Sequence, residues 1–292
     1  MSASSTPTVG VVLLTMGQRP EELSRAIASV QSQRGVAVNI AVVGNGWQPK
    51  GLPRGVTGVG LLENVGIPAG RNAGVPHVAG DYLLFLDDDA RLLADDFLAR
   101  SLNLLAERPD VGLIQPRVDG AGGAPAPRRW IPRIRKGDAH RSSTCMLVWE
   151  GALVMPRKVF DAMGGWGDPY FYAHEGIELA WRVWNAGYRV WYAADLAVEH
   201  PVVSPTRHAD YYRLNARNRV WLARRNLPAV WGFFYVVNWA VVQHLRWLRN
   251  PQGLRAWWSG VREGLRVNPG GRSRLRARTI GRMARAGRAP II

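Results

Sequence analysis

The chain has 292 residues, of which 47% are hydrophobic, so it can bury the core of one large α/β domain plus an extension. Its one cysteine, Cys145, excludes an intramolecular disulfide and a thiolate metal cluster, which fits a reducing cytosol. The formal net charge of +16 is carried by residues 201–292, which hold 18 Arg, no Lys and two acidic residues. Residues 1–200 carry no net charge, so this neutral part and the cationic extension after it need separate explanations.

Apolar runs and helical spacings alternate along the first 110 residues. The run at residues 8–20 ends at Gly17 and Pro20 and is too short for a signal peptide, so it predicts a first strand. We expect further strands at 37–46, 57–64 and 81–87, and helices at 21–33, within 66–80 and at 94–109. This alternation predicts an α/β fold with a mostly parallel sheet and helices on both faces.

The second half of the chain begins with a Gly-, Pro- and Arg-rich stretch, residues 119–144, which predicts a long surface loop. After it we expect a strand, a short helix at 156–163, a Gly-Gly-Trp-Gly turn, a helix at about 175–186 and a strand at 188–193. We divide the chain into a domain of residues 1–225, with halves at about 8–118 and 145–225, and a basic extension of residues 226–292.

Three consecutive carboxylates, Asp87, Asp88 and Asp89, follow the strand predicted at 81–87. Adjacent carboxylates repel each other, and Mg²⁺ and Mn²⁺ are hard cations that prefer carboxylate oxygens and leave room for phosphate oxygens. The triplet therefore favours a divalent cation, although a solvated turn would use the same residue type. His200 follows the last strand and could complete such a site as a neutral imidazole, although a lone histidine is more often structural.

Several turns fall at the ends of predicted strands. In parallel sheets ligands bind at the carboxyl ends of the strands, so Thr15, the turn at Gly44–Gly46 and the aspartate triplet are expected at one edge. The Gly-rich run NVGIPAGRNAG, residues 64–74, adds backbone that can approach a ligand and Arg71, a bidentate donor suited to phosphate. It is neither a Walker A loop nor a dinucleotide fingerprint, and a loop–helix junction with a surface arginine would look the same.

Two carboxylates in the stretch HEGIELAWR, Glu175 and Glu178, lie three residues apart and share a helix face. A carboxylate at the start of a helix beside aromatic residues can have a raised pKa, which suits a general base. The alternative is a helix N-terminus whose acids are favoured by the helix dipole, with Arg182 paired to Glu178.

Taken in order, several stretches over roughly residues 9–225 resemble family 2 glycosyltransferases of the GT-A fold. They are VVLLTMGQRPEELSRAIASVQSQ, NVGIPAGRNAGVPHVAGDYLLFLDDDA, GGWGDPYFYAHEGIELAWRVWNAGYRV, VEHP and ARNR. The branch most resembled is the rhamnosyl- and galactofuranosyl-transferase-like one. The resemblance implies a Rossmann-like GT-A domain and an inverting transfer from a UDP-, dTDP- or GDP-sugar.

The resemblance also implies roles for individual residues. Asp87 and Asp89 match the DxD motif that holds Mn²⁺ or Mg²⁺, and His200 matches a histidine that some members use as a further ligand. Contacts with the nucleotide-sugar fall on Thr15, Gly44, Asn45, Asn64, Gly70, Arg71, Asn72 and Asp88. Acceptor contacts fall on Gly165, Trp166 and His174. Glu175 is the expected general base and Glu178 the reserve.

Two positions depart from the family pattern. The second strand commonly ends in an aspartate that recognises the base, and here that residue is Gly44. The usual Glu-Asp of the catalytic-base motif reads Glu175-Gly176. These departures keep open a non-catalytic nucleotide-sugar or glycan-binding protein on the same fold. A nucleotidyltransferase is the second alternative, and the lack of a Gly-rich triphosphate loop near the N-terminus counts against it.

The basic extension begins with an apolar stretch, residues 227–248, that polar residues interrupt too often for a membrane span. Its tryptophans and flanking arginines indicate a helix that lies in a membrane interface, and the seven arginines of residues 270–288 suit an anionic leaflet. We therefore expect a cytoplasmic enzyme on the inner face of the plasma membrane, with a lipid-linked, polysaccharide or other cell-envelope acceptor. A packed helical cap is the first alternative, and nucleic-acid binding the weaker second one.

Overall fold

The computed structural model describes residues 6–132, 137–204 and 210–290. Its centre is a nine-stranded sheet with the order β3-β2-β1-β4-β8-β6-β9-β5, and β7 pairs with β9 outside this path. The strands are β1 (Thr8–Thr15), β2 (Ala37–Gly44), β3 (Val56–Gly60), β4 (Tyr82–Asp87), β5 (Arg91–Leu92), β6 (Val111–Gly120), β7 (Ser143–Cys145), β8 (Ala152–Pro156) and β9 (Arg189–His200).

The sheet is parallel on its N-terminal side and mixed beyond it. Strands β1 to β4 pair in parallel, β8 runs antiparallel to both β4 and β6, and β6 pairs in parallel with β9. The predicted α/β fold with a mostly parallel sheet is confirmed. Strand β6 was not predicted, because Pro116 interrupts its apolar run. That proline lies where the register of β6 against β9 shifts, and such an irregularity tolerates the missing N–H.

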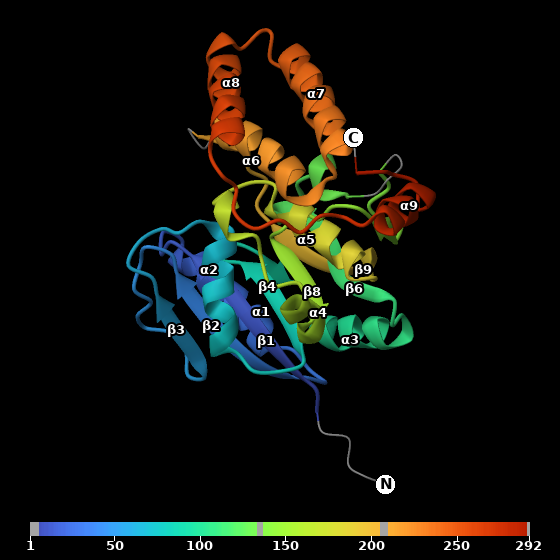
Figure 1. Ribbon diagram of the computed structural model, residues 1–292. Coiled ribbons are helices and arrows are strands. Elements are labelled where there is room, and N and C mark those ends of the chain that lie inside the picture. Colours follow the sequence, from blue (N-terminus) through green and yellow to red (C-terminus); the bar gives the residue numbers. More distant parts are fainter. Residues whose placement is uncertain (1–5, 133–136, 205–209, 291–292) are drawn as a thin grey trace.

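Helices cover both faces of the sheet (Figure 1). They are α1 (Pro20–Gln31), α2 (Ile67–Gly74), α3 (Phe97–Glu107), α4 (Arg157–Ala162) and α5 (Glu175–Asn185). Successive side chains of a strand point to opposite faces, so β1 contributes Val11 and Leu13 to the core with α1 and α3, and Val12 to the core with α5. Burial on both faces explains why the β1 sequence is an unbroken apolar run.

The C-terminal region is helical, as predicted, and consists of α6 (Tyr211–Asn226), α7 (Ala229–Arg246), α8 (Pro251–Arg266) and α9 (Ala277–Arg285). Helices α7 and α8 form a hairpin that projects from the α/β body with α6 at its base (Figure 1). Gly260 lets α8 approach α6 closely, because a Cβ there would lie 2.0 Å from the Arg213 carbonyl oxygen. Of the helices in the described ranges, none is long and apolar enough to cross a membrane.

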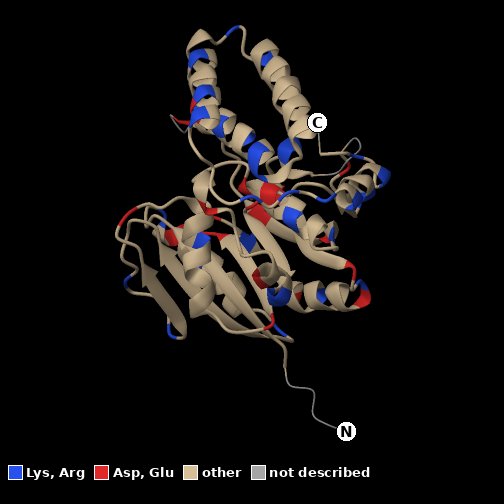
Figure 2. Ribbon diagram, viewed as in Figure 1, with Lys and Arg blue, Asp and Glu red and all other residues tan. Residues whose placement is uncertain are grey.

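Basic side chains dominate this region, whereas the acidic ones lie mainly in the body (Figure 2). The arginine-rich end of the chain packs on the body through α9, whose Ile280 and Met283 enter the main hydrophobic core. Arg272, Arg274 and Arg276 nevertheless stay exposed. The end of the chain is thus a packed element with a cationic outer surface, and the domain boundary at residue 225 stays a prediction.

Candidate active site

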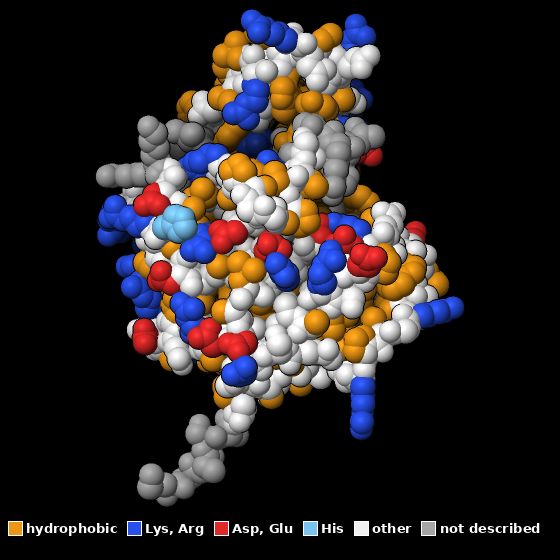
Figure 3. Space-filling model, turned by 180° about the vertical axis from the view of Figure 1, so that it is seen from behind, with side chains coloured by type: hydrophobic (Ala, Val, Ile, Leu, Met, Phe, Trp, Pro, Cys, Tyr) orange, Lys and Arg blue, Asp and Glu red, His pale blue; other side chains and the backbone are white. Residues whose placement is uncertain are grey.

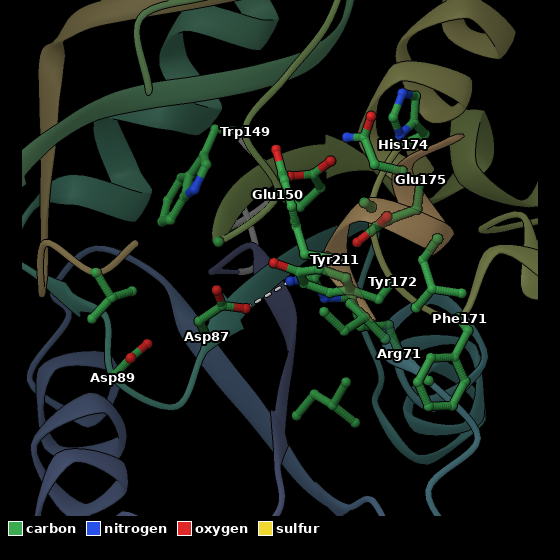
Figure 4. Close-up of a pocket in the computed structure, with 18 of the residues that line it drawn as sticks. Arg71, Asp87, Asp89, Trp149, Glu150, Phe171, Tyr172, His174, Glu175 and Tyr211 are labelled. Atoms are coloured by element: carbon green, nitrogen blue, oxygen red, sulfur yellow. Dashed lines mark hydrogen bonds and ion pairs between the residues drawn. The ribbon is translucent and has the colours of Figure 1, made fainter. Parts of the chain in front are cut away.

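A cavity of about 710 Å³ lies at the carboxyl ends of the central strands. Its walls come from distant parts of the chain: the ends of β1, β4 and β9, the loop before α5, and helix α6 (Figure 4). The predicted site residues that line it are Thr15, Asn45, Asn64, Arg71, Asp87, Asp88, Asp89, His174, Glu175 and His200. The strand-end geometry therefore brings together most of the predicted site.

A candidate metal site lies at one side of the cavity. Ligand atoms of Asp87, Asp89 and His200 all lie within 4.8 Å of one another, and His200 Nε2 is 3.0 Å from Asp89 Oδ1. The other ring nitrogen, Nδ1, lies 2.7 Å from the Pro201 carbonyl oxygen, an acceptor that fixes the proton on Nδ1. Burial lowers the pKa of His200, so a neutral ring turns its Nε2 lone pair toward two carboxylates. This donor set fits a divalent cation.

Guanidinium groups balance the three aspartates. Arg71 Nη2 lies 2.7 Å from Asp87 Oδ1, and this ion pair is drawn in Figure 4. Arg19, which the sequence analysis missed, reaches both Asp89 and Asp88, with 2.9 Å between Nη2 and Asp88 Oδ1. Thr15 Oγ1 donates to the other oxygen of Asp88 at 2.6 Å. Cationic partners thus offset the repulsion within the triplet.

Two side-chain amides, those of Asn45 and Asn64, also line the cavity. Asn45 Nδ2 donates to Asn64 Oδ1 at 2.8 Å, and Asn45 Oδ1 accepts from the Val65 N–H at 2.9 Å. Gly44 and Gly70 do not line the cavity. A Cβ at Gly44 would lie 2.0 Å from the Trp47 carbonyl oxygen, and one at Gly70 would lie 2.5 Å from the Leu14 side chain. Both glycines therefore allow close packing behind the site.

Asn72, Gly165 and Trp166 also lie outside the cavity lining. The Asn72 side chain holds the Trp166 backbone from both sides, accepting from its N–H at 2.9 Å and donating to its carbonyl at 3.0 Å. The buried Trp166 ring packs edge-on against Phe85 and lies under the Arg71 guanidinium, 4.8 Å away. These three residues were predicted to contact ligands, but they instead pack behind Arg71.

Two carboxyl groups face the cavity from its other side (Figure 4). Glu175 begins α5 and is buried, and burial, followed by the charge of Glu150, raises its pKa to about 8. Glu150 was missed by the sequence analysis; its Oε1 accepts from the Gly176 N–H at 3.0 Å, and desolvation raises its pKa. A Cβ at Gly176 would lie 2.4 Å from that oxygen, so the Glu150 carboxyl occupies the room that a side chain at 176 would need.

Glu178 has no place in the cavity lining. Its carboxylate is fully buried and binds Arg225 Nε at 2.8 Å, Arg182 Nη2 at 3.1 Å and Asn226 Nδ2 at 2.8 Å. These partners tie α5 to α6. These contacts favour a structural role for Glu178, and its role as the reserve base stays a prediction.

The loop before α5 is held in an unusual conformation. Phe171, Ala173 and His174 have φ angles of 64°, 69° and 74°, which is costly for residues with a side chain. Asn218 of α6 compensates, because its Nδ2 lies 2.9, 2.6 and 2.8 Å from the carbonyl oxygens of residues 170, 172 and 173. The His174 ring beside it is buried, and neither of its nitrogens has a hydrogen-bond partner. Helix α6 thus fixes the loop that presents Glu175.

Comparisons with known proteins agree with this architecture. The fold is the GT-A fold, a mixed sheet with acidic residues at the end of a central strand. The family model described as glycosyl transferase family 2 matches residues 11–164, so the chain belongs to this family. None of the curated proteins compared with the chain matches its sequence.

Three solved structures illustrate the likeness of fold. GalNAc-T7 with UDP, GalNAc and Mn²⁺ has a TM-score of 0.61 at 15% identity, over 80% of this chain and 50% of that chain. The mannosyltransferase PcManGT from Pyrobaculum calidifontis, with GDP-Man and Mn²⁺, has a TM-score of 0.56 at 19% identity, and the match covers 99% of this chain and 78% of that chain. TarS 1–349 from S. aureus, with UDP-GlcNAc, has a TM-score of 0.61 at 12% identity, and the match covers 94% of this chain and 83% of that chain. The chain thus spans half the length of the GalNAc-T7 chain.

Proposed function

We propose that this protein is an inverting glycosyltransferase that moves a sugar from a nucleotide-diphosphate sugar to an acceptor hydroxyl. The observation that carries the proposal is the meeting, in one cavity, of the Asp87–Asp89–His200 group and the Glu150–Glu175 carboxyl pair. Family membership supports it, as do the UDP-, UDP-GlcNAc- and GDP-Man-bound proteins of similar fold. A binding protein without catalysis would have no need for a pair of carboxyl groups with raised pKa values in the same cavity as a metal-type site.

The donor end would hold Mn²⁺ or Mg²⁺ through Asp87, Asp89 and His200. When bound, such a cation neutralises charge on a departing diphosphate. Arg19 and Arg71 already stand at these carboxylates and add cationic donors for phosphate oxygens. Asn45 and Asn64 would face the nucleoside, and the absence of a carboxylate at Gly44 leaves amide and backbone groups to recognise the base.

The acceptor end would use Glu175 as the general base. Its Oε2 has no hydrogen-bond partner, so it can receive the proton of the attacking hydroxyl. Glu150 is held by the Gly176 N–H beside it, and its charge adds to burial in raising the pKa of Glu175. We propose that Glu150 takes the room left by the missing side chain at Gly176 and, after burial, raises the pKa of the base further.

The projecting hairpin supports a membrane-surface role. Helix α7 exposes an apolar stripe at helical spacing, and hydrophobic side chains and arginines gather on these helices (Figure 3). The stripe consists of Val230, Phe233, Phe234, Val237, Val241, Val242 and Leu245, and the exposed Leu248 follows just after the helix. An apolar patch of this kind marks an interaction surface, and the arginines that surround it complement an anionic leaflet. We propose that this stripe lies on the inner face of the plasma membrane.

Donor binding can be tested by thermal unfolding of the protein with a panel of UDP-, dTDP- and GDP-sugars, with and without Mn²⁺. A donor at about 100 times its Kd should add about 2.7 kcal/mol of stability. We expect a Mn²⁺-dependent shift with one nucleotide class, lost in Asp89→Ala and kept in Asp95→Ala, an exposed carboxylate outside the site. No shift with any nucleotide, with or without metal, would contradict the proposal.

Membrane binding can be tested by co-sedimentation with phosphatidylcholine vesicles, with and without phosphatidylglycerol. We expect binding that requires the anionic lipid and falls at least about tenfold in a Phe233→Ser/Phe234→Ser variant, because each Phe side chain contributes about 1.5–3 kcal/mol when buried. Leu62→Ser, at a fully exposed position on the body, is the matched control. Equal binding by the double variant would leave the hairpin as a packed cap, and binding to nucleic acid instead of vesicles would favour the second alternative.

A further inference from the structure

A second cavity, of about 220 Å³, adjoins the active-site cavity and shares Leu147, Ile177 and Arg219 with its lining. The rest of its wall is mainly apolar and aromatic: Met146, Trp181, Tyr235, Trp239, Ala289 and Pro290, together with Arg288. We call this space the aromatic chamber. It gives the active site a largely apolar side compartment, which a hydrophilic sugar acceptor alone would not need.

Arg219 stands at the junction of the two spaces and is only 8% exposed. Its guanidinium lies 3.8 Å from the centre of the Trp239 ring, and Nη1 donates to the Tyr235 hydroxyl at 3.3 Å. Its Nε has no hydrogen-bond partner, and within the described ranges no carboxylate forms an ion pair with it. A guanidinium stays charged in proteins, and a buried charge without a counter-ion is costly. This position therefore suits an anionic ligand group.

The surroundings of Arg219 place that anion at the acceptor side of the active site. Burial is the larger cause of the low pKa of His174, and the charge of Arg219 lowers it further. His174 precedes Glu175, the proposed base. The donor diphosphate has its own cationic partners, Arg19 and Arg71, at the aspartate triplet. A second anion at Arg219 thus belongs to the acceptor.

The aromatic chamber lies under the proposed membrane-binding helix. Tyr235 and Trp239 project into it from α7, whose other face carries the exposed apolar stripe. An apolar chain held in the chamber would thus lie between the membrane-facing helix and the active-site cavity. Stacking on aromatic faces and dispersion contacts would retain such a chain without directional bonds.

We propose that the acceptor is an amphiphile with a phosphate group near its reacting hydroxyl and an apolar chain. Arg219 binds the phosphate, because a guanidinium offers paired donors to phosphate oxygens, and the aromatic chamber holds the chain. This inference rests on the proposed function, since it delivers the hydroxyl to Glu175. It narrows the acceptor to one chemical class, a phosphorylated lipid.

The test is equilibrium binding, by calorimetry, of dodecyl phosphate below its micelle concentration to the full chain. Dodecyl maltoside, dodecanoate and inorganic phosphate are compared as the neutral amphiphile, the carboxylate amphiphile and the free anion. We expect dodecyl phosphate to bind at least tenfold more tightly than each of the three. In Arg219→Gln this preference should disappear, a loss of about 1.4 kcal/mol or more.

Two further variants separate the parts of the site. Arg262→Gln removes the same charge from an exposed position on α8 and should leave binding unchanged. Trp239→Leu removes the aromatic wall and should weaken dodecyl phosphate binding, but not that of inorganic phosphate. Unchanged binding of dodecyl phosphate in Arg219→Gln, or equal binding of dodecyl maltoside by the unaltered protein, would overturn the inference. Stronger binding of dodecanoate would overturn the phosphate assignment.

The nucleotide-sugar thermal shift is recorded for every variant, because it reports the donor end and shows that the variant is folded. If Arg219→Gln does not fold, Arg219→Lys, which keeps the charge but loses the paired donors, replaces it and should lose part of the preference for dodecyl phosphate. A donor shift without dodecyl phosphate binding would refute this inference alone. Dodecyl phosphate binding without any donor shift would refute the proposed function instead.

Discussion

The two ends of the active-site cavity differ in how their charges are balanced. At the donor end each aspartate of the triplet has a guanidinium partner, and His200 Nδ1 is paired with a backbone carbonyl. At the acceptor end Glu175 Oε2, both nitrogens of His174 and Arg219 Nε are buried without hydrogen-bond partners. The charges of the donor end are thus paired within the protein, although Arg71 Nη1 lacks a hydrogen-bond partner, whereas the acceptor end keeps several polar groups whose partners a ligand would supply.

The difference follows from the elements that build each end. Strand register fixes the donor end, because β1, β2 and β4 end side by side in a parallel sheet. The acceptor end depends on a loop with left-handed residues that Asn218 holds in place. Surrounding packing can stabilise such a strained loop with incomplete hydrogen bonding, and functional sites often store strain in this way.

The sharpest test of the comparison is Glu175→Gln, which removes the proposed base and leaves the donor end intact. We expect kcat to fall by about 10²–10⁴-fold, the usual contribution of a positioned general base. The Mn²⁺-dependent nucleotide-sugar shift should persist. Glu107→Gln, an exposed carboxylate at the end of α3, is the control and should keep full activity. Activity of Glu175→Gln within tenfold of the unaltered protein would exclude Glu175 as the base.

Glu178→Gln should act on stability rather than on chemistry. The change leaves the buried guanidinium of Arg225 without its carboxylate, and breaking a buried ion pair costs about 3–5 kcal/mol. Urea unfolding measures this loss, and the activity of the folded fraction should remain. Glu199→Gln, which breaks the more exposed pair with Arg91, should cost no more than about 1 kcal/mol. A stable but inactive Glu178→Gln would favour Glu178 as the base.

A smaller effect concerns the pH dependence of activity. Because Glu175 has a pKa of about 8, activity should rise with pH and level off above that value. Glu150→Gln removes a neighbouring negative charge, so it should lower the pKa of Glu175 and move the rise to lower pH. The pH profile of kcat measures both. If the rise of kcat occurs at the same pH in Glu150→Gln as in the unaltered protein, burial alone raises the pKa of Glu175.

The same group links pH to stability. The folded protein holds the Glu175 proton more tightly than the unfolded chain, whose carboxyl has its ordinary pKa near 4.5. The contribution of this group to the free energy of unfolding is therefore fully present below about pH 4.5 and is lost as pH rises through about 8. Glu175→Gln should flatten this part of the stability profile, which thermal unfolding at several pH values would show.

The donor end could largely be predicted from the sequence, because it depends on where strands end. Thr15, Asn45 and the aspartate triplet all follow apolar runs, and parallel strands bring such positions to one edge. Gly44, Gly70, Asn72, Gly165 and Trp166 were assigned to ligands but lie behind the cavity wall. A loop–helix sequence does not show which side of its backbone faces the ligand.

The acceptor end could be predicted only in part, because it depends on pairing between distant segments. Glu150 stands alone in the run MLVWEGALVMP, and an acid in an otherwise buried strand entry was a signal that could have found it. Arg219 was hidden within the basic stretch ARNRVWLARRN, where nothing separates a buried arginine from exposed ones. The burial of Glu178 could not be predicted, because a three-residue spacing shows a shared helix face but not what covers it.

The hydrogen bonds from Asn218 to the loop before α5 have a consequence for where the reaction takes place. These hydrogen bonds join the loop to α6, and α6 is also the base of the projecting hairpin (Figure 1). The proposed base, Glu175, and the apolar stripe of α7 are therefore both connected to α6. With the stripe on a lipid surface, α6 would set the distance from that surface at which an acceptor hydroxyl reaches the proposed base.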